Sequence, residues 1–354
     1  MRWQKSSRSV SPHKLSMNDL QVERIWLTPI AKDKKHQVWR KFAMAHEFES
    51  GFFVNQPAWH RLGKLLNNPP TTEQAIIEAG LDWKVEEEPL YRIEKDGLVK
   101  IPTHKSLIRD WDRQLLGVVS NGYHPLQNSE AFKWFDILLH EGDVSLEAAG
   151  SLKRGKRIWI LAKIQINPIE IQQEDAIQPY LLLHNSHDAT GAIWIQFTPI
   201  RVVCWNTLSW ATASRYKDEK NCKAFRIRHN SNIEEKLAFA QRALNLSRQM
   251  FDTAIEEYKA MALKPMTSEL LELYLANIFE SDNVRENRAF PLIQSNFETG
   301  RGNQGQTLWD AYNGFTEWLD HQRGKSEVSR LESAWFGDSV RLRNKAHLEA
   351  LALV

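Results

Sequence analysis

Residues of the types that bind metal ions lie close together in the stretch HNSHD, residues 184–188. His184, His187 and Asp188 offer two imidazoles and a carboxylate, ligands that suit zinc, manganese or iron. An extended strand would point the two histidines to opposite faces, so they converge only if the segment after His184 forms a turn. This spacing matches no established metal motif. We therefore expect a hydrogen-bonded turn that uses Ser186 and Asp188, and we favour no cofactor, with a divalent metal as the alternative.

Other catalytic arrangements find little support in the sequence. Ser186 stands between two histidines, but neighbouring residues rarely face each other and no Gly-x-Ser-x-Gly elbow is present. The glycine-rich run GRGNQGQT, residues 300–307, precedes a predicted helix but lacks the Lys-Ser/Thr of a nucleotide-binding loop. A plain loop with Thr307 as the helix cap is the simpler interpretation. We favour a protein without catalytic activity and keep a nuclease-like, metal-dependent enzyme at the HNSHD turn as the alternative.

Two basic runs offer a different chemistry, which is contact with phosphate groups. The first is SLKRGKR, residues 151–157, and the second is RYKDEKNCKAFRIRH, residues 215–229. A formal net charge of only +2 means that any attraction for nucleic acid must be local. Each run alone is more typical of a solvated hairpin tip or connection. The candidate nucleic-acid-binding residues in them are Lys153, Arg154, Lys156, Arg157, Arg215, Lys217, Lys223, Arg226 and Arg228.

Tryptophan is unusually frequent, with 14 residues, and several of these rings lie at hairpin edges or beside cations. Stacking of a base on an aromatic side chain contributes about 1–3 kcal/mol, so a few exposed rings next to lysines would suffice to bind a single strand. Many tryptophans should instead be buried anchors of the core. The candidates for stacking are Trp111, Trp159, Trp194, Trp205 and Trp210.

The stretch TPIRVVCWNTL, residues 198–208, places polar side chains within an apolar strand. A buried arginine must be paired, so the first expectation is an ion pair between Arg201 and Asp188 or Glu147. An open sheet face would instead extend the basic hairpin into a basic, aromatic groove. The nucleic-acid contacts added in that case are Arg201, Trp205 and Asn206.

The composition is that of a soluble globular protein, with 354 residues of which 42% are hydrophobic and 25% are charged. No run approaches the roughly 18 uninterrupted apolar residues of a spanning helix, and the N-terminus lacks the apolar segment of a secretory signal. The two cysteines, Cys204 and Cys222, fit a reducing compartment. These features predict a cytoplasmic protein that has no membrane partner.

The elements that must position the candidate residues follow from the apolar patterns. Alternation predicts an antiparallel meander over residues 83–124 and a hairpin over 146–166 that bends at KRGK. Further strands are expected between residues 180 and 208, with a short edge strand near 224–229. Helical periodicity predicts helices over 72–80, 128–142, 233–261, 268–279, 306–322 and 337–353. The fold class is therefore α+β, an antiparallel sheet with hairpins and covering helices, followed by a helical C-terminal third.

We divide the chain into three parts. Residues 1–43 are basic, rich in serine and lysine, and only weakly periodic, and we expect a flexible extension there. Residues 44–230 should form the α+β sheet domain, and residues 231–354 a helical C-terminal region that packs on it.

Eight motifs follow one another along about residues 44–354. They are PAWHRLG, GLDWKVE, GYHPLQNSEAF, AAGSLKRGKRIWILAK, YLLLHNSHDATGAI, TPIRVVCWNTL, GQTLWDAYNGFTEWLDH and SAWFGD. In this combination the chain resembles the phage/plasmid-like protein family, a family of unknown function whose members occur on phages, plasmids and integrated elements. One departure is Arg61, where the family commonly has glycine. The resemblance implies a role connected with the DNA of a mobile element. This implication rests on where the family members occur, and not on a mechanism.

The hypothesis that follows is a nucleic-acid-binding protein, for single-stranded DNA above all, that serves replication, recombination or protection of mobile-element DNA. Such a protein would show strongly salt-dependent affinity, because each neutralised phosphate releases counterions. The sequence leaves two further partners open, which are a second copy of the chain in a homo-oligomer and a host protein. In the latter case the chain would be an anti-defence factor that binds a component of a host defence system.

Overall fold

The structure is a computed structural model that describes residues 48–55, 63–188, 194–202, 224–226, 233–324, 330, 333 and 337–354. The expected extension at residues 1–43 lies outside these ranges. The described chain combines antiparallel sheets with a helical C-terminal region, which confirms the α+β prediction. None of the helices in the described ranges is long and apolar enough to cross a membrane.

The larger sheet has eight strands in the order β11-β10-β9-β7-β6-β1-β2, with β8 paired to β9. All of its pairs are antiparallel except β1 with β2, which are parallel. The predicted hairpin at KRGK is the connection of β6 and β7, and the predicted edge strand is β11. The strands are β1 Phe48–Val54, β2 Lys64–Leu66, β6 Val144–Leu152, β7 Arg157–Ile164, β8 Ile169–Gln172, β9 Asp175–Ser186, β10 Trp194–Arg201 and β11 Ala224–Arg226.

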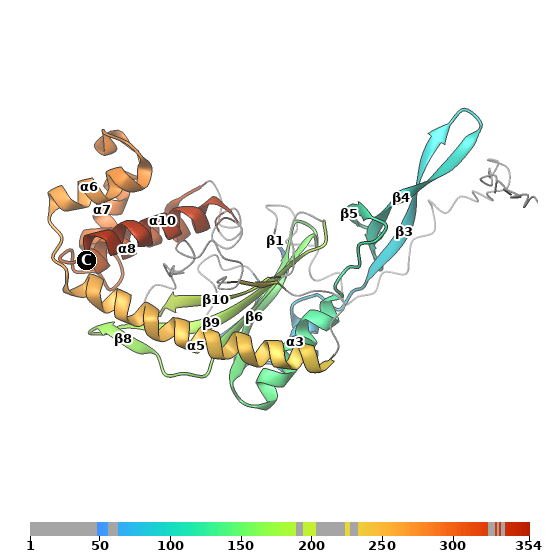
Figure 1. Ribbon diagram of the computed structural model, residues 1–354, viewed down its shortest axis with the longest axis horizontal. Coiled ribbons are helices and arrows are strands. Elements are labelled where there is room, and N and C mark those ends of the chain that lie inside the picture. Colours follow the sequence, from blue (N-terminus) through green and yellow to red (C-terminus); the bar gives the residue numbers. More distant parts are fainter. Residues whose placement is uncertain are drawn as a thin grey trace, which may run out of the picture.

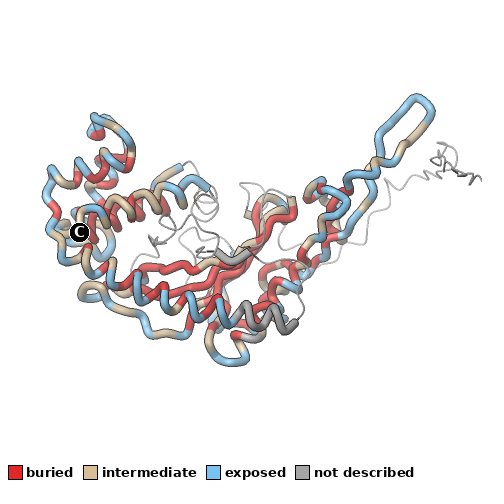
Figure 2. Tube along the Cα trace, in the orientation of Figure 1, coloured by how far each residue is buried: buried red, intermediate tan, exposed pale blue. Residues whose placement is uncertain are grey.

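The central strands are buried on both faces, as their long apolar runs require. One face carries Ile160, Leu181 and Leu183 into the main core. There the sheet is covered by helices α2 (Thr72–Glu78), α3 (Asn128–His140) and α5 (Ile233–Leu263). The other face gathers Trp159 and Leu182 in a second, smaller apolar cluster. Figure 2 shows the resulting buried band along the middle of the sheet.

A second, three-stranded sheet lies at one end of the large one (Figure 1). It consists of β3 (Val85–Glu94), β4 (Gly97–Arg109) and β5 (Leu115–Ser120) in sequential antiparallel order, which confirms the predicted meander. Gly117 of β5 lies directly against the end of β9, since a Cβ there would come within 2.7 Å of Asp188 Cα. Beyond β5, β3 and β4 continue alone as a long hairpin that projects from the body.

The helices mostly match the predicted ranges, and their ends follow local capping. The short α2 begins after Thr71, not after Thr72 as expected, because Thr71 and Gln74 form a reciprocal capping box. The sequence missed α7, whose first turn contains a proline. The helices are α2 Thr72–Glu78, α3 Asn128–His140, α5 Ile233–Leu263, α6 Ser268–Phe279, η3 Val284–Glu286, α7 Phe290–Thr299, α8 Leu308–Glu317, η4 Trp318–Gln322 and α10 Asp338–Leu353.

The 31-residue helix α5 runs along the sheet and joins it to the C-terminal helices (Figure 1). Phe251 of α5 packs edge-on against Phe197 of β10, with ring centroids 6.3 Å apart. Further along the helix, Tyr258 contacts Trp309 of α8 at 4.9 Å. One continuous apolar core therefore includes residues of both the sheet and the helical region. The boundary that we expect near residue 230 stays a prediction.

Candidate nucleic-acid interface

The basic run at residues 153–157 forms the tight connection between β6 and β7, which we call the basic turn. Lys153, Arg154 and Gly155 all have positive φ, of 55°, 57° and 80°. A left-handed conformation costs a residue other than glycine about 1–2 kcal/mol, so two such residues in succession are held there by their surroundings. The turn is closed by the N–H of Lys156, which donates to Lys153 O at 3.3 Å. Sequence and backbone thus present four cations on a short, constrained segment.

Gly155 packs the basic turn directly against Arg109 and Trp83, a contact that the sequence did not reveal. A Cβ on Gly155 would lie 2.9 Å from Arg109 Nη1 and 3.2 Å from Trp83 Cζ2, so only glycine allows this approach. The guanidinium of Arg109 lies over the rings of Trp83 and Trp111, at 5.4 and 5.0 Å from their centroids. The one hint in the sequence was a glycine inside a basic run, which signals a turn but not what lies beneath it.

Arg109 itself is neutralised within the protein and does not serve as a phosphate contact. It donates from Nη1 to Glu49 at 2.7 Å, and from Nε and Nη2 to both oxygens of Asp112 at 2.8 and 2.7 Å. Burial lowers its pKa, but the hydrogen bonds and charges of Asp112 and Glu49 outweigh burial and leave the pKa raised. The support is therefore a fixed cation–carboxylate cluster that anchors the turn.

The cations of the turn differ in their surroundings. Arg154 is exposed, and Lys153, Lys156 and Arg157 are partly buried. Among the residues that the structure describes, neither Arg154 nor Lys156 has a carboxylate partner. The backbone of Lys156 is fixed by a hydrogen bond to the residue after β9, because its carbonyl accepts the N–H of His187 at 2.7 Å. These two side chains are thus the best-placed candidates for a phosphate.

The sheet face next to Arg157 is not the open aromatic platform that an extended groove would need. Trp159 is fully buried, and its ring lies against Gly150 and 5.7 Å from Phe53. Trp194 is partly exposed and is paired in register with His184. Burial is the larger cause and the positive charge of Arg157 the smaller cause that lower the pKa of His184 to about 4. This imidazole is therefore neutral at physiological pH. Trp159 is therefore removed from the stacking candidates.

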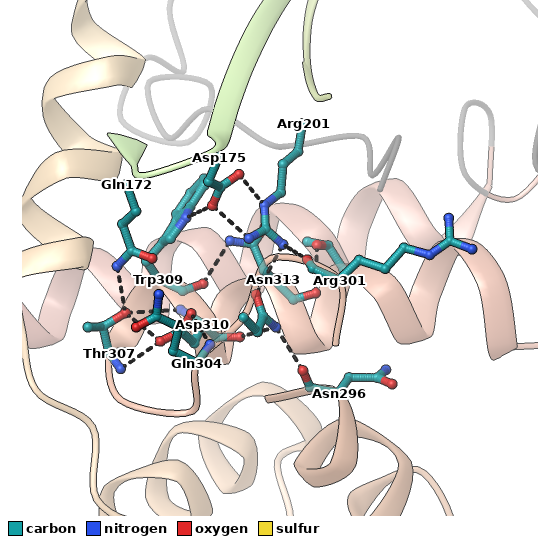
Figure 3. A network of polar contacts seen from close by, with 12 residues as sticks. Gln172, Asp175, Arg201, Asn296, Arg301, Gln304, Thr307, Trp309, Asp310 and Asn313 are labelled. Carbon is teal, nitrogen blue, oxygen red and sulfur yellow. Dashed lines mark hydrogen bonds and ion pairs between the residues drawn. The ribbon is translucent and has the colours of Figure 1, made fainter. Parts of the chain in front are cut away.

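Arg201 was wrongly included among the candidate contacts, because its side chain has no exposed surface. Its Nε and Nη2 donate to the two oxygens of Asp175, both at 2.6 Å, and Nη1 donates to Arg301 O at 2.8 Å (Figure 3). The expectation of a buried ion pair is confirmed, but the partner is neither Asp188 nor Glu147. The same carboxylate of Asp175 also accepts from Trp309 Nε1 at 2.6 Å. This hydrogen-bond network connects β9 and β10 to the helical region.

The glycine-rich loop at residues 300–307 uses its N–H groups within the protein. The carboxylate of Asp310 accepts from the backbone of Gln304, Gln306 and Thr307 at 3.2, 3.1 and 3.0 Å (Figure 3). Thr307 accepts in return from the backbone of Asp310 and caps α8, as the sequence predicted. These backbone N–H groups therefore already donate to a carboxylate of the chain itself.

The HNSHD segment is a turn only in its last two residues. His184 to Ser186 belong to strand β9, and His187 and Asp188 form a bend. Ser186 Oγ donates to Asp188 Oδ1, and the fully buried ring of His187 shares a 3.0 Å hydrogen bond between Nε2 and Asn128 Oδ1. Burial lowers the pKa of His187 to about 4, against the opposing charge of Asp188. His184 lies on the strand, and no group of three or more His, Cys, Asp or Glu in the described chain is arranged to hold a metal ion.

The structure does not describe the side chains of the following candidates. The side chain of Arg226 is not described, although its backbone lies in β11. The candidates outside the described residues are Trp205, Asn206, Trp210, Arg215, Lys217, Lys223 and Arg228. Among the described candidates, the four cations of the basic turn lie near one end of β9, where Arg157 pairs with Ser186, and Arg201 lies near the other end, where it pairs with Ile177.

Comparison with known families gives one match. A family model described as "Domain of unknown function (DUF932)" matches residues 115–335. The matched range includes the basic turn, the HNSHD turn and the Asp175–Arg201 network, and it excludes β3 and β4. Neither curated proteins nor solved structures contain a match to the chain.

Proposed function

We propose that this chain, which belongs to the DUF932 family, binds nucleic acid through the phosphate contacts of its basic turn. Two features of the basic turn together carry the proposal. Arg154 and Lys156 have no carboxylate partner in the described chain, and a strained backbone fixes their position. Strained segments persist where the surroundings hold them, and they cluster at functional sites. The support of Arg109, Trp83 and Trp111 supplies that constraint here.

We further propose that the nucleic acid is single-stranded DNA of a mobile element. The tryptophan content of the chain motivates the single-strand preference, and Trp111, a partly exposed ring in the support of the basic turn, is the stacking candidate that lies next to the proposed phosphate contacts. The association with phages and plasmids rests on the resemblance of the motifs. Replication, recombination or protection of that DNA are the processes in which such binding would act.

Fluorescence anisotropy of a labelled oligonucleotide, single-stranded and then duplex, tests the proposal at several salt concentrations. The informative variant is Arg154→Ala/Lys156→Ala. The matched control is Arg288→Ala/Lys264→Ala, which removes one exposed arginine and one partly buried lysine from the helical region. Circular dichroism of all three proteins establishes that the fold is unchanged.

The wild-type protein should bind with an affinity that falls steeply as salt rises, because phosphate contacts release counterions. Loss of two single-strand contacts should reduce the slope of log K against log salt by about 1.4, at roughly 0.7 per contact. The control should keep the wild-type slope. Absence of binding to every oligonucleotide at low salt, or a turn variant that binds like the control, would refute the proposal.

A further inference from the structure

Two successive amide side chains at the start of α3 bind the segment that carries Trp83. Gln127 donates from Nε2 to Val85 O at 3.0 Å, and its Oε1 accepts from Val85 N at 2.9 Å. The next residue, Asn128, is fully buried, and its Nδ2 donates to Leu81 O at 3.1 Å and lies 3.5 Å from Trp83 O. Both amides therefore bind the chain segment whose indole supports the basic turn.

These contacts determine which way the amide of Asn128 points. Its Nδ2 faces the carbonyl of Leu81, so the atom that lies 3.0 Å from His187 Nε2 is Oδ1, which can only accept. His187 Nε2 must therefore carry a proton. The ring is neutral at physiological pH because burial lowers the pKa of His187 to about 4, and Nδ1 is accordingly the unprotonated nitrogen.

His187 contacts both the basic turn and the indole beneath it. Its backbone N–H donates to Lys156 O at 2.7 Å, and its ring lies edge-on to Trp83, with centroids 5.5 Å apart. The same indole lies under Gly155 of the turn, 3.2 Å from the position of an added Cβ. Asn128 therefore binds the two residues, Trp83 and His187, that contact the turn.

The bend that carries His187 is also confined by β5. A Cβ on Gly117 of β5 would lie 2.9 Å from His187 O and 2.7 Å from Asp188 Cα. Contacts to β5 and to the start of α3 thus leave the bend little freedom to shift. The position of the His187 N–H, and with it that of Lys156 O, is fixed before any ligand binds.

We propose that His187 and Asn128 are positioning residues for the phosphate-binding cations of the basic turn. Neither side chain is exposed, so both act through the backbone of Lys156 and the indole under Gly155. A turn that is fixed in advance loses less conformational entropy when it contacts a phosphate, and this raises the affinity. The inference rests on the proposed function of the turn, and it gives the HNSHD segment a role in that function.

Fluorescence anisotropy of the labelled single-stranded oligonucleotide at low salt tests the positioning role. The perturbing variant is His187→Leu, which deletes the donor to Asn128 and keeps a side chain in the cavity. His187→Gln is the conservative variant, because its amide nitrogen can donate to Asn128 Oδ1 in place of Nε2. Tyr274→Phe is the matched control, since it deletes a buried hydrogen bond of the helical region, from Tyr274 Oη to Ala346 O at 2.9 Å.

We expect His187→Leu to lower the affinity at least about threefold, and His187→Gln and Tyr274→Phe to bind within about twofold of wild type. In the Arg154→Ala/Lys156→Ala background, His187→Leu should have no further effect, because the cations that it positions are absent. A loss of equal size in both backgrounds would show that His187 acts on the fold as a whole and would overturn the proposal. Wild-type affinity of His187→Leu would do the same.

Long-range ¹H–¹⁵N NMR tests the geometry without nucleic acid. The ring signals of His187 are identified among those of 12 histidines by their absence from the His187→Gln spectrum. We expect a protonated Nε2 and an unprotonated Nδ1 at neutral pH. The opposite tautomer, or a charged ring, would contradict the positioning role and leave the proposed function standing. If the wild-type protein binds no oligonucleotide, the proposed function fails and this inference fails with it, whatever the tautomer.

Discussion

The pairing of Asp175 with Arg201 should be among the most sensitive points of the fold. Both side chains are essentially fully buried, and Asp175 accepts three hydrogen bonds, two from Arg201 and one from Trp309. The substitution Asp175→Asn keeps the volume of the side chain but removes its charge. It would leave the Arg201 guanidinium buried without a counter-ion and turn an amide N–H₂ toward a donor.

The expected cost can be estimated from the loss of one partner. Breaking a buried ion pair by removal of one charge costs about 3–5 kcal/mol, because the remaining charge stays desolvated and uncompensated. The variant Asp175→Leu/Arg201→Met removes both charges of the pair, but it leaves Trp309 Nε1, Arg301 O and Asn303 Oδ1 without these partners, at about 1–3 kcal/mol for each unsatisfied group.

Urea unfolding followed by tryptophan fluorescence and circular dichroism measures these differences. Tryptophan emission is the sum over 14 residues, of which Trp309 contacts Asp175 directly, and circular dichroism reports the whole fold. Both variants should be less stable than wild type, Asp175→Asn by about 3–5 kcal/mol. The reasoning fails if either variant lies within about 1 kcal/mol of wild type.

Two further predictions concern the basic turn and the buried histidines. Gly155→Ala should cost more stability than Gly142→Ala, because both glycines have left-handed φ values of 80° and 73° but only Gly155 has neighbours within 4 Å of an added Cβ; equal urea midpoints would contradict this packing argument. The pKa values of His184 and His187, about 4 in the folded protein against 6.5 when unfolded, mean that the unfolded chain binds more protons between these pH values. Stability should therefore be full above about pH 6.5 and fall as the pH drops toward 4, by about 2 kcal/mol per histidine at pH 5. Urea unfolding at pH 7.5 and 5 tests this, and a His187→Gln variant with the full wild-type loss would refute it.

Local patterns predicted the elements well because they depend on neighbours in the sequence. The meander, the β6–β7 hairpin and the cap of α8 at Thr307 follow from alternation, turn residues and capping chemistry. The interpretation of Arg201 went as far as a buried ion pair. The partner required the register of β9 and β10, which sets Arg201 opposite Ile177 and therefore near Asp175, and register is a long-range property.

The role of Trp159 shows the other limit. An aromatic residue beside a basic turn suits both a stacking platform and a buried anchor, and alternation does not tell whether the second face of a sheet is covered. Here Gly150 stands opposite Trp159 in the register and leaves room for the indole to lie against the sheet. The absence of one Cβ on a neighbouring strand thus decides the burial of the ring.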